Sequence, residues 1–213
     1  MTEKINTPLF LSTISDYYSA KIKKHGETAQ GVDWNSTASQ ILRFEQLSKV
    51  IAPSTPFSIN DLGCGYGAYY DYLSNHYTSF SYEGIDISEE MVNSANMHYK
   101  TQNNARFTLS NEPPQLADYG IASGIFNVCL ELSKTQWQSY IDTTLNLLDR
   151  TSRLGFAFNC LTTYSDADKM HDYLYYANPC TLFDLCKQRY SRNVALLHDY
   201  GLYEFTILVR KTS

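Results

Sequence analysis

Apolar residues recur with two different periods along the chain. Before about position 52 they return every three or four residues, which is typical of amphipathic helices. Beyond it, short apolar runs alternate with longer helical patterns, which indicates an α/β architecture. We expect helices at about 8–24, from 36 or 37 to 51, from 68 onward, and at 89–99, 137–148 and 179–190, with strands at about 57–62, 82–87, 106–109, 117–126, 153–159, 194–197 and 204–209.

The segment 57–72, FSINDLGCGYGAYYDY, is where a strand pattern meets a helix pattern. Its apolar run ends at Leu62, and glycines then stand at Gly63, Gly65 and Gly67. Glycine permits a positive φ and lets a ligand press on bare backbone, while the first N–H groups of the following helix carry partial positive charge. The turn is therefore a candidate nucleotide-binding site, with a tight connection that binds nothing as the simpler alternative.

Two acidic residues discriminate between possible ligands of this turn. Gly63, Gly65 and Ala68 satisfy the G-x-G-x-x-G/A dinucleotide pattern, but short glycine patterns also recur by chance. Asp61 precedes the first glycine, where a carboxylate would repel a pyrophosphate and attract an ammonium group. S-adenosylmethionine carries an ammonium group and no phosphate. Asp86 ends the next predicted strand, about 20 residues beyond the turn, where an acid can accept hydrogen bonds from ribose hydroxyls.

The motif DLGCGYG, followed by GIDIS, resembles motif I and the second-strand acid of class I S-adenosylmethionine-dependent methyltransferases. The resemblance runs from about position 57 to the C-terminus, and the segments HGETAQGVDWNSTASQILRF, ASGIFNV and HDYGLYEFTILV are similar to a bacterial branch of this superfamily. It implies a Rossmann-like doubly wound sheet of seven strands with a C-terminal antiparallel hairpin and N-terminal lid helices. The last two predicted strands, joined around Gly201, fit such a hairpin, whereas a plain dinucleotide-binding sheet is typically all parallel.

The resemblance also implies a cofactor, S-adenosyl-L-methionine, with S-adenosyl-L-homocysteine as product. Asp61 and the backbone of 63–67 would hold the methionine part, Asp86 the ribose, and the 110–111 loop the adenine. A lid residue, Arg43, could meet the methionine carboxylate. The implied cofactor-binding set is Asp61, Gly63, Cys64, Gly65, Tyr66, Gly67, Asp86, Ile87, Met91, Ser110, Asn111, Ser123, Gly124 and Arg43. For Ser110, Asn111 and Arg43, ordinary turn or surface roles are an equal alternative.

Substrate contacts are expected from the N-terminal loop, from the strand end that would border the transferred methyl group, and from the tyrosine-rich segment 161–176. Aromatic walls suit sugars, flat rings or cationic amines. General packing is the alternative, because 18 tyrosines are spread over the whole chain. The candidate substrate residues are Trp34, Asn127, Tyr164 and Tyr176.

Methyl transfer is an in-line displacement in which the cofactor supplies the electrophile, so the protein mainly aligns the reactants and excludes water. A base is needed only if the acceptor must lose a proton. His171, and His198 with Asp199 near a sheet end, are candidates because histidine titrates near neutrality, although each also suits a solvated surface. A nicotinamide-dependent oxidoreductase, disfavoured by Asp61 and the hairpin, and a noncatalytic S-adenosylmethionine-binding protein are the competing interpretations.

Composition narrows the class of substrate. The 213 residues carry a formal net charge of −5 with a pI near 5.5, which argues against a surface that binds nucleic-acid phosphates. The N/D-P-P-aromatic tetrad of amino methyltransferases that act on nucleic-acid bases is absent, which argues against nucleic acid as the acceptor. No apolar run suits a membrane span or a signal sequence, so we expect a cytoplasmic protein acting on a small molecule.

The cysteines and the chain length indicate the redox state of the thiols and the number of domains. Five cysteines without a C-x-x-C pair suggest reduced thiols and neither disulfides nor a metal site, with Cys64 a small residue that fits the turn. We expect one methyltransferase domain over 1–213, with a helical cap at 1–52 and a Rossmann-like core at 53–213.

Overall fold

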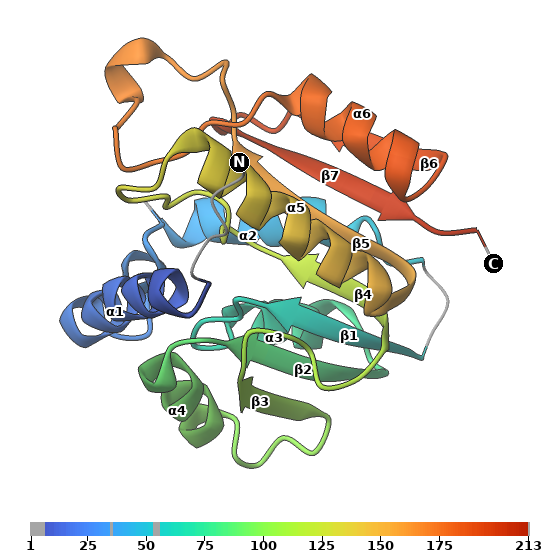
Figure 1. Cartoon of the computed structure of the whole chain (residues 1–213). Helices are drawn as coiled ribbons and strands as arrows, with labels where there is room; N and C mark the ends of the chain where they lie inside the picture. Colours follow the sequence, from blue (N-terminus) through green and yellow to red (C-terminus); the bar gives the residue numbers. More distant parts are fainter. Residues whose placement is uncertain (1–6, 35, 53–55, 213) are drawn as a thin grey trace.

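A seven-stranded sheet runs through the structure, a computed structural model that describes residues 7–34, 36–52 and 56–212. Its order is β3-β2-β1-β4-β5-β7-β6, with parallel pairs from β3 to β5 and β7 antiparallel to both of its neighbours. The strands are β1 (Phe57–Leu62), β2 (Phe80–Asp86), β3 (Ala105–Leu109), β4 (Ala117–Ala122), β5 (Ser152–Leu161), β6 (Asn193–Leu197) and β7 (Glu204–Arg210). This order confirms the predicted sheet and its C-terminal hairpin (Figure 1).

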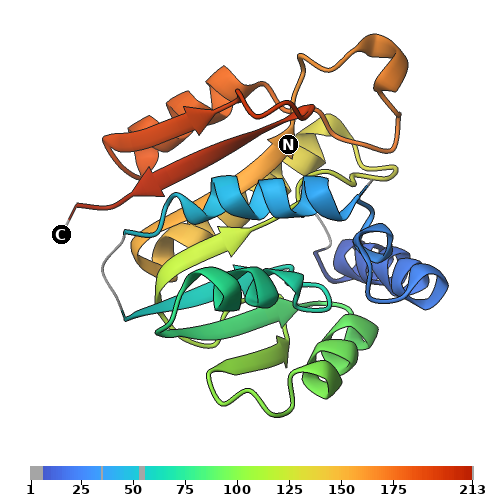
Figure 2. The ribbon, with the colours of Figure 1, turned by 180° about the vertical axis from the view of Figure 1, so that it is seen from behind.

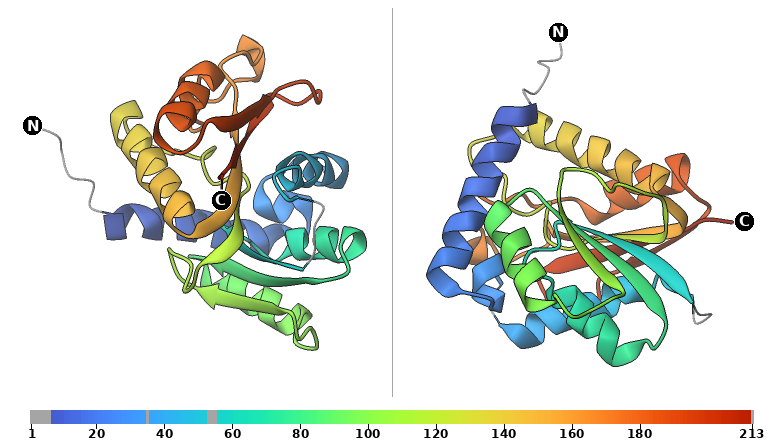
Figure 3. Two further views of the ribbon diagram at one scale, coloured as in Figure 1. Left: turned by 90° about the vertical axis from the view of Figure 1, so that its right-hand side faces the viewer. Right: turned by 90° about the horizontal axis from the view of Figure 1, so that it is seen from below.

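Helices cover both faces of the sheet. Figure 3 shows α5 and α6 on one side and α2 and α3 on the other. The first pair shares one apolar cluster with the sheet, and α2, α3 and α4 share a second. The helices are α1 (Thr7–His25), α2 (Thr37–Ser48), α3 (Ala68–His76), α4 (Glu89–His98), α5 (Lys134–Arg150) and α6 (Pro179–Arg189), with short 3-10 helices η1 (Ala29–Val32) and η2 (Ala167–Lys169).

The two N-terminal helices, which were expected to form a lid, have different positions. α1 lies beyond the carboxyl ends of the parallel strands, whereas α2 lies flat on a face of the sheet (Figure 2). Phe44 and Leu47 of α2 are buried in the apolar cluster of that face, so α2 is a core helix and its Ile41 faces outward. α1 thus lies over the carboxyl edge, while α2 contributes Gln40 and Phe44 to the cavity described below.

α1 is attached differently at its two ends. Near its start, Phe10 packs edge-on against Trp137 of α5, with ring centroids 5.5 Å apart. Further along, Ser15 Oγ donates to the Ile87 carbonyl at 3.0 Å and Ser19 Oγ to Glu90 Oε2 at 2.6 Å. The lid is thus anchored by apolar contact on one side of the carboxyl edge and by polar contacts on the other.

Several element ends follow from local chemistry. Ser88 caps α4 as predicted, and Asn178 with Pro179 opens α6, which gives the Asn-Pro pair a structural explanation. β4 ends at Ala122 and not near 126, because Gly124 adopts a φ of +78° and turns the chain out of the sheet. The predicted boundary between cap and core lies next to residues 53–55, which are outside the described residues. The division at 52 therefore stays a prediction.

The connection between β3 and β4, residues 110–116, contains no helix. The sheet face beneath it is polar: Thr108 Oγ1 donates to Glu83 Oε1 at 2.5 Å, and Asn60 Nδ2 donates to the Gln115 carbonyl at 2.9 Å. Because no helix fills this place, α5 borders the carboxyl edge directly and contributes Thr143, Thr144 and Leu147 to the cavity described below.

Candidate active site

The parallel strands form a cavity where their order reverses. β1 lies between β2 and β4, and ligands of open α/β sheets bind in the crevice at such a switch point. A cavity of about 250 Å³, here called the switch-point cavity, opens there beneath α1. Twelve of the fourteen predicted cofactor residues line it: Asp61, Gly63, Cys64, Gly65, Tyr66, Asp86, Ile87, Met91, Ser110, Asn111, Ser123 and Gly124.

Asp61 presents an unpaired carboxylate oxygen at this cavity. Its Oδ2 accepts a hydrogen bond from the Tyr82 hydroxyl at 2.6 Å, while its buried Oδ1 has no partner among the described residues. Burial raises the pKa of the Asp61 carboxyl to about 7, with a further contribution from the charge of Asp86. A buried, half-satisfied carboxylate suits a cationic partner, because such a partner would satisfy Oδ1 and lower the pKa.

Asp86 ties the glycine turn to the end of β2. Its Oδ2 accepts from the Gly65 N–H at 2.8 Å and its Oδ1 from the Ser88 N–H at 2.9 Å. The N–H groups of Gly63 and Cys64 both donate to the Ile85 carbonyl. The turn amides that we expected to face a ligand are therefore largely occupied within the protein. Burial raises the pKa of Asp86, and hydrogen bonds from the backbone of Ser88, Gly65 and Ile87 oppose that shift.

Gly67, predicted to bind the cofactor, does not line the cavity. It precedes α3 with a φ of +91°, and a Cβ at this position would lie 2.6 Å from Tyr99 Cε2. Its glycine identity is explained by packing against Tyr99 and Phe107. Cys64 does line the cavity, but its buried thiol has a pKa raised well above its usual value, as expected of a packing residue and not of a nucleophile.

The remaining predicted cofactor residues lie at the two ends of the cavity. Ser110 Oγ is engaged with Glu112, donating to its carbonyl at 2.8 Å and accepting from its N–H, and Asn111 is exposed at the rim. Ser123 Oγ is buried without a hydrogen-bond partner in the described part of the chain. Asp61 Oδ1 and Ser123 Oγ are thus two unsatisfied polar atoms in one cavity, which fits a polar cofactor.

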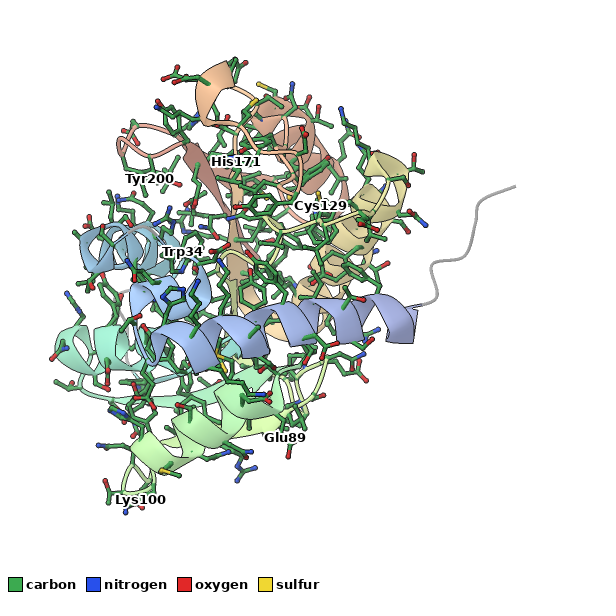
Figure 4. All side chains as sticks on the ribbon, turned by 90° about the vertical axis from the view of Figure 1, so that its left-hand side faces the viewer. Trp34, Glu89, Lys100, Cys129, His171 and Tyr200 are labelled. Carbon is green, nitrogen blue, oxygen red and sulfur yellow. The ribbon has the colours of Figure 1, made fainter. Side chains whose placement is uncertain are left out.

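A second cavity of about 590 Å³ adjoins the first on the side of the β6–β7 connection, and we call it the hairpin cavity. The two cavities share five lining residues: Tyr18, Val32, Trp34, Gly124 and Val128. Trp34 packs on Gly124 at the border between them, since a Cβ on Gly124 would lie 2.4 Å from Trp34 Cζ2. Figure 4 shows Trp34 between α1 and the segment that carries His171.

Arg43 lines the hairpin cavity and not the switch-point cavity, which corrects its predicted contact with the methionine carboxylate. Its Nε and Nη2 donate to Glu204 at 2.8 and 2.7 Å, and its guanidinium lies 3.9 Å from the Trp34 ring centroid. Both side chains of the ion pair are buried. The glutamate satisfies the charge that was expected to meet a ligand.

A buried chain of hydrogen bonds leads from this ion pair to the wall between the cavities. Asn159 Nδ2 donates to Glu204 Oε2 at 2.6 Å, and Asn159 Oδ1 accepts from the Gly124 N–H at 2.7 Å. Residues from α2, β7, β5 and the end of β4 are linked in this way. Asn159 and Glu204 were not singled out from the sequence, because each looks like an ordinary residue of a strand.

The predicted substrate and base residues separate into two groups. Trp34, Asn127, Tyr176 and His171 line the hairpin cavity. Tyr164 and His198 line neither cavity; their rings lie 5.9 Å apart on the outside, where both are exposed. Tyr18 was missed in the sequence, although it lines both cavities and its hydroxyl has no hydrogen-bond partner among the described residues. The spacing of Tyr18 from the other apolar residues of α1 indicated only a role in packing.

Other features of the described residues bear on the class of protein. All five cysteines are free, and all except Cys180 are buried. No helix in the described ranges is long and apolar enough to cross a membrane. Within the same ranges, His, Cys, Asp and Glu nowhere gather in a group of three that could hold a metal ion.

Comparisons with known proteins agree with this geometry. Residues 59–152 match a family described as "Methyltransferase domain". The Mycobacterium tuberculosis protein named "Putative methyltransferase Rv1506c" is 58% identical over 165 residues, which are 78% of this chain and 99% of that protein.

Two solved structures share the fold at 13% identity. Magnesium protoporphyrin IX methyltransferase from Synechocystis with bound SAM has a TM-score of 0.64, covering 99% of this chain and 100% of the other, and the DhpI-SAM-HEP complex has a TM-score of 0.65, covering 95% and 98%. None of these comparisons supports the oxidoreductase alternative. With the sheet order, the switch-point cavity and the close relative together, the chain belongs to the class I S-adenosylmethionine-dependent methyltransferase superfamily.

Proposed function

We propose that this protein transfers a methyl group from S-adenosylmethionine in the switch-point cavity to a small-molecule acceptor in the hairpin cavity. The observation that carries the proposal is the shared wall at Trp34 and Gly124, where contents of the two cavities can meet. An acceptor and a cofactor that reach this shared border from the two cavities would have the proximity that a bimolecular displacement needs.

The residues of the switch-point cavity hold and orient the cofactor in this proposal. When bound, S-adenosylmethionine supplies an electrophilic methyl group; the acceptor atom forms a bond to its carbon as the carbon–sulfur bond breaks. The free Oδ1 of Asp61 binds the ammonium group, and Asp86 accepts from the ribose hydroxyls. Leu11, Ile14 and Tyr18 of α1 line this cavity, and in this proposal the helix shields the bound cofactor from water.

A proton must leave the acceptor if the acceptor atom carries one. Of the two histidines considered as bases, His171 lines the hairpin cavity and His198 does not, so we assign the proton to His171. His171→Gln should lower kcat by about 10²-fold. His198→Gln is the matched control and should leave kcat unchanged; equal effects of the two substitutions would remove His171 from the reaction.

Calorimetric titration tests cofactor binding without knowledge of the acceptor. We expect binding of S-adenosylmethionine and S-adenosylhomocysteine in the micromolar range and none of NADH. If a folded preparation showed no calorimetric binding of either sulfur ligand, the proposal would be overturned. Binding without conversion to S-adenosylhomocysteine across a broad acceptor panel would instead support a noncatalytic binding protein.

A further inference from the structure

The hairpin cavity has an unusual balance of charge. Six of its lining residues can carry charge, and five of these stand in ion pairs: Arg43 with Glu204 at 2.7 Å, Asp33 with Lys21 at 2.5 Å, and Asp168 with its neighbour Lys169 at 3.1 Å. His171 is the sixth. Apart from His171, the charged groups of the cavity wall are therefore compensated by ion pairs and offer no unpaired charge to an acceptor.

The same cavity offers hydrogen-bond donors that the protein leaves unused. Arg43 is 6% exposed, and its Nη1 is buried without a partner in the described residues because Glu204 takes Nε and Nη2. Asn127 accepts from the Leu161 N–H through Oδ1, and no interaction is formed by its Nδ2 within the described chain. The Tyr18 hydroxyl is likewise free, and burial keeps its pKa well above the usual value, so it remains a donor.

Aromatic rings complete the wall. Trp34, Tyr173, Tyr176 and Tyr203 line the cavity together with the three donors. Flat rings give an apolar surface against which C–H groups of a ring can pack, while the donors require oxygen atoms between them. A carboxylate or phosphate next to Arg43 would lie beside the buried carboxylate of Glu204, which would repel it at short range.

We infer that the acceptor is an uncharged, hydroxyl-bearing molecule of the sugar class, one of whose oxygens accepts a hydrogen bond from Arg43 Nη1. Glu204 sets this specificity by neutralising Arg43 while holding it in place. The inference rests on the proposed function, because it names the substrate class of the same site. It also explains why the arginine is buried beside Trp34 and not exposed to attract an anion.

Matched acceptor pairs test the inference. The probes are the methyl glycosides of glucose, galactose and mannose, and the corresponding uronic acids, which differ by a carboxylate; phenols and alkylamines of similar size are included. Binding is measured by saturation-transfer NMR in the presence of S-adenosylhomocysteine, and methyl transfer by S-adenosylhomocysteine formation. We expect at least one neutral glycoside to be preferred over its uronate by about tenfold or more.

Two variants make the result specific to the ion pair. Glu204→Gln keeps an oxygen for Arg43 but exposes its charge, and should shift the preference toward the uronate by about tenfold. The double variant Arg43→Met with Glu204→Gln removes both charges and should keep the preference for the neutral member with weaker binding. Retained S-adenosylhomocysteine binding by calorimetry shows that each variant is folded.

The outcomes separate this inference from the proposed function. Failure of the wild-type protein to bind S-adenosylhomocysteine would contradict the proposed function itself. Normal S-adenosylhomocysteine binding together with preference for uronates, phenols or amines, or with no binding of any neutral glycoside, would overturn the sugar-class acceptor alone. An unchanged preference in folded Glu204→Gln would overturn the role of Glu204.

Discussion

The two cavities share a wall, but they are assembled from different parts of the chain. In the switch-point cavity, the polar groups proposed to meet the cofactor come from strand ends and turns between Asp61 and Gly124, and α5 adds Thr143 and Thr144. The hairpin cavity takes its polar groups from α2, from the segment 161–176 and from the β6–β7 connection. One cavity is therefore a property of the fold, whereas the other depends on tertiary pairs such as Arg43 with Glu204.

This difference separates the binding of the cofactor from the specificity for the acceptor. In the switch-point cavity an unpaired carboxylate oxygen at Asp61 remains for a cation. In the hairpin cavity the charges within each ion pair compensate one another, and hydrogen-bond donors remain for an uncharged acceptor. Substitutions in the first cavity should affect cofactor binding, and those in the second should affect the acceptor alone.

The largest expected effect is on cofactor binding through Asp61. Asp61→Asn keeps the acceptor for Tyr82 but removes the charge, and should weaken S-adenosylhomocysteine binding by about 100-fold, because hydrogen bonds to charged groups contribute roughly 1.5–3 kcal/mol. Calorimetry measures it. The matched control is Asp118→Asn, whose carboxylate binds Ser58 and Arg153 outside both cavities and should leave the affinity unchanged.

Asp86→Ala should have a similar but smaller effect, weakening cofactor binding by about 10–100-fold. The substitution removes both the proposed ribose contact and the acceptor that holds the Gly65 N–H. Calorimetric affinity for S-adenosylhomocysteine is again the measurement. Unchanged affinity would exclude Asp86 from the site.

The pH dependence of binding should report the ionisation of Asp61. Because its pKa lies near 7 in the ligand-free protein, S-adenosylhomocysteine affinity should fall by about tenfold for each pH unit below 7. Asp61→Asn should flatten this profile. A wild-type profile that is flat between pH 5 and pH 8 would contradict a charged contact at this carboxylate.

The same pKa has the opposite consequence for stability. The folded carboxyl binds its proton more tightly than the unfolded one, so Asp61 makes the ligand-free protein less stable as pH rises from about 4 to 7. Unfolding in urea, compared between the wild type and Asp61→Asn over that range, should show a larger loss in the wild type, because the raised pKa of Asp86 acts in both proteins. A saturating concentration of S-adenosylhomocysteine should reduce it.

The smallest effect concerns the wall between the cavities. Gly124→Ala and Gly201→Ala both place alanine at a positive φ, but a Cβ would meet Trp34 only at position 124 and nothing within 4 Å at position 201. Gly124→Ala should therefore lower the free energy of unfolding by about 1–3 kcal/mol more than Gly201→Ala. In a Trp34→Ala background the difference should disappear, and equal losses in the wild-type background would contradict the contact.

The sequence predicted the switch-point cavity better than the hairpin cavity for a physical reason. Strand ends, glycines and caps are local signals, and the register of parallel strands brings Asp61, Asp86 and Ser123 to one edge. The pairing of Arg43 with Glu204 joins residues 161 positions apart. No local pattern encodes such a pair, so the family resemblance assigned Arg43 to the cofactor, and Asn159 and Glu204 were not singled out.

The fold shows the same contrast. The strands and the C-terminal hairpin were predicted, since strand patterns and turn residues are short-range features, and the doubly wound arrangement followed from the family resemblance. The place of α2 was not, because an amphipathic helix gives its apolar face but not the surface that this face covers. The connection between β3 and β4 contains no helix, in agreement with the proline-containing loop that was expected there.

A crystal structure of the protein with S-adenosylhomocysteine would test the central claim most directly. The account predicts the amino group within hydrogen-bond distance of Asp61 Oδ1, the ribose at Asp86, and the sulfur facing the wall formed by Trp34 and Gly124. S-adenosylhomocysteine bound in the hairpin cavity, or bound with its sulfur turned away from that wall, would contradict the assignment of one cavity to the cofactor and the other to the acceptor.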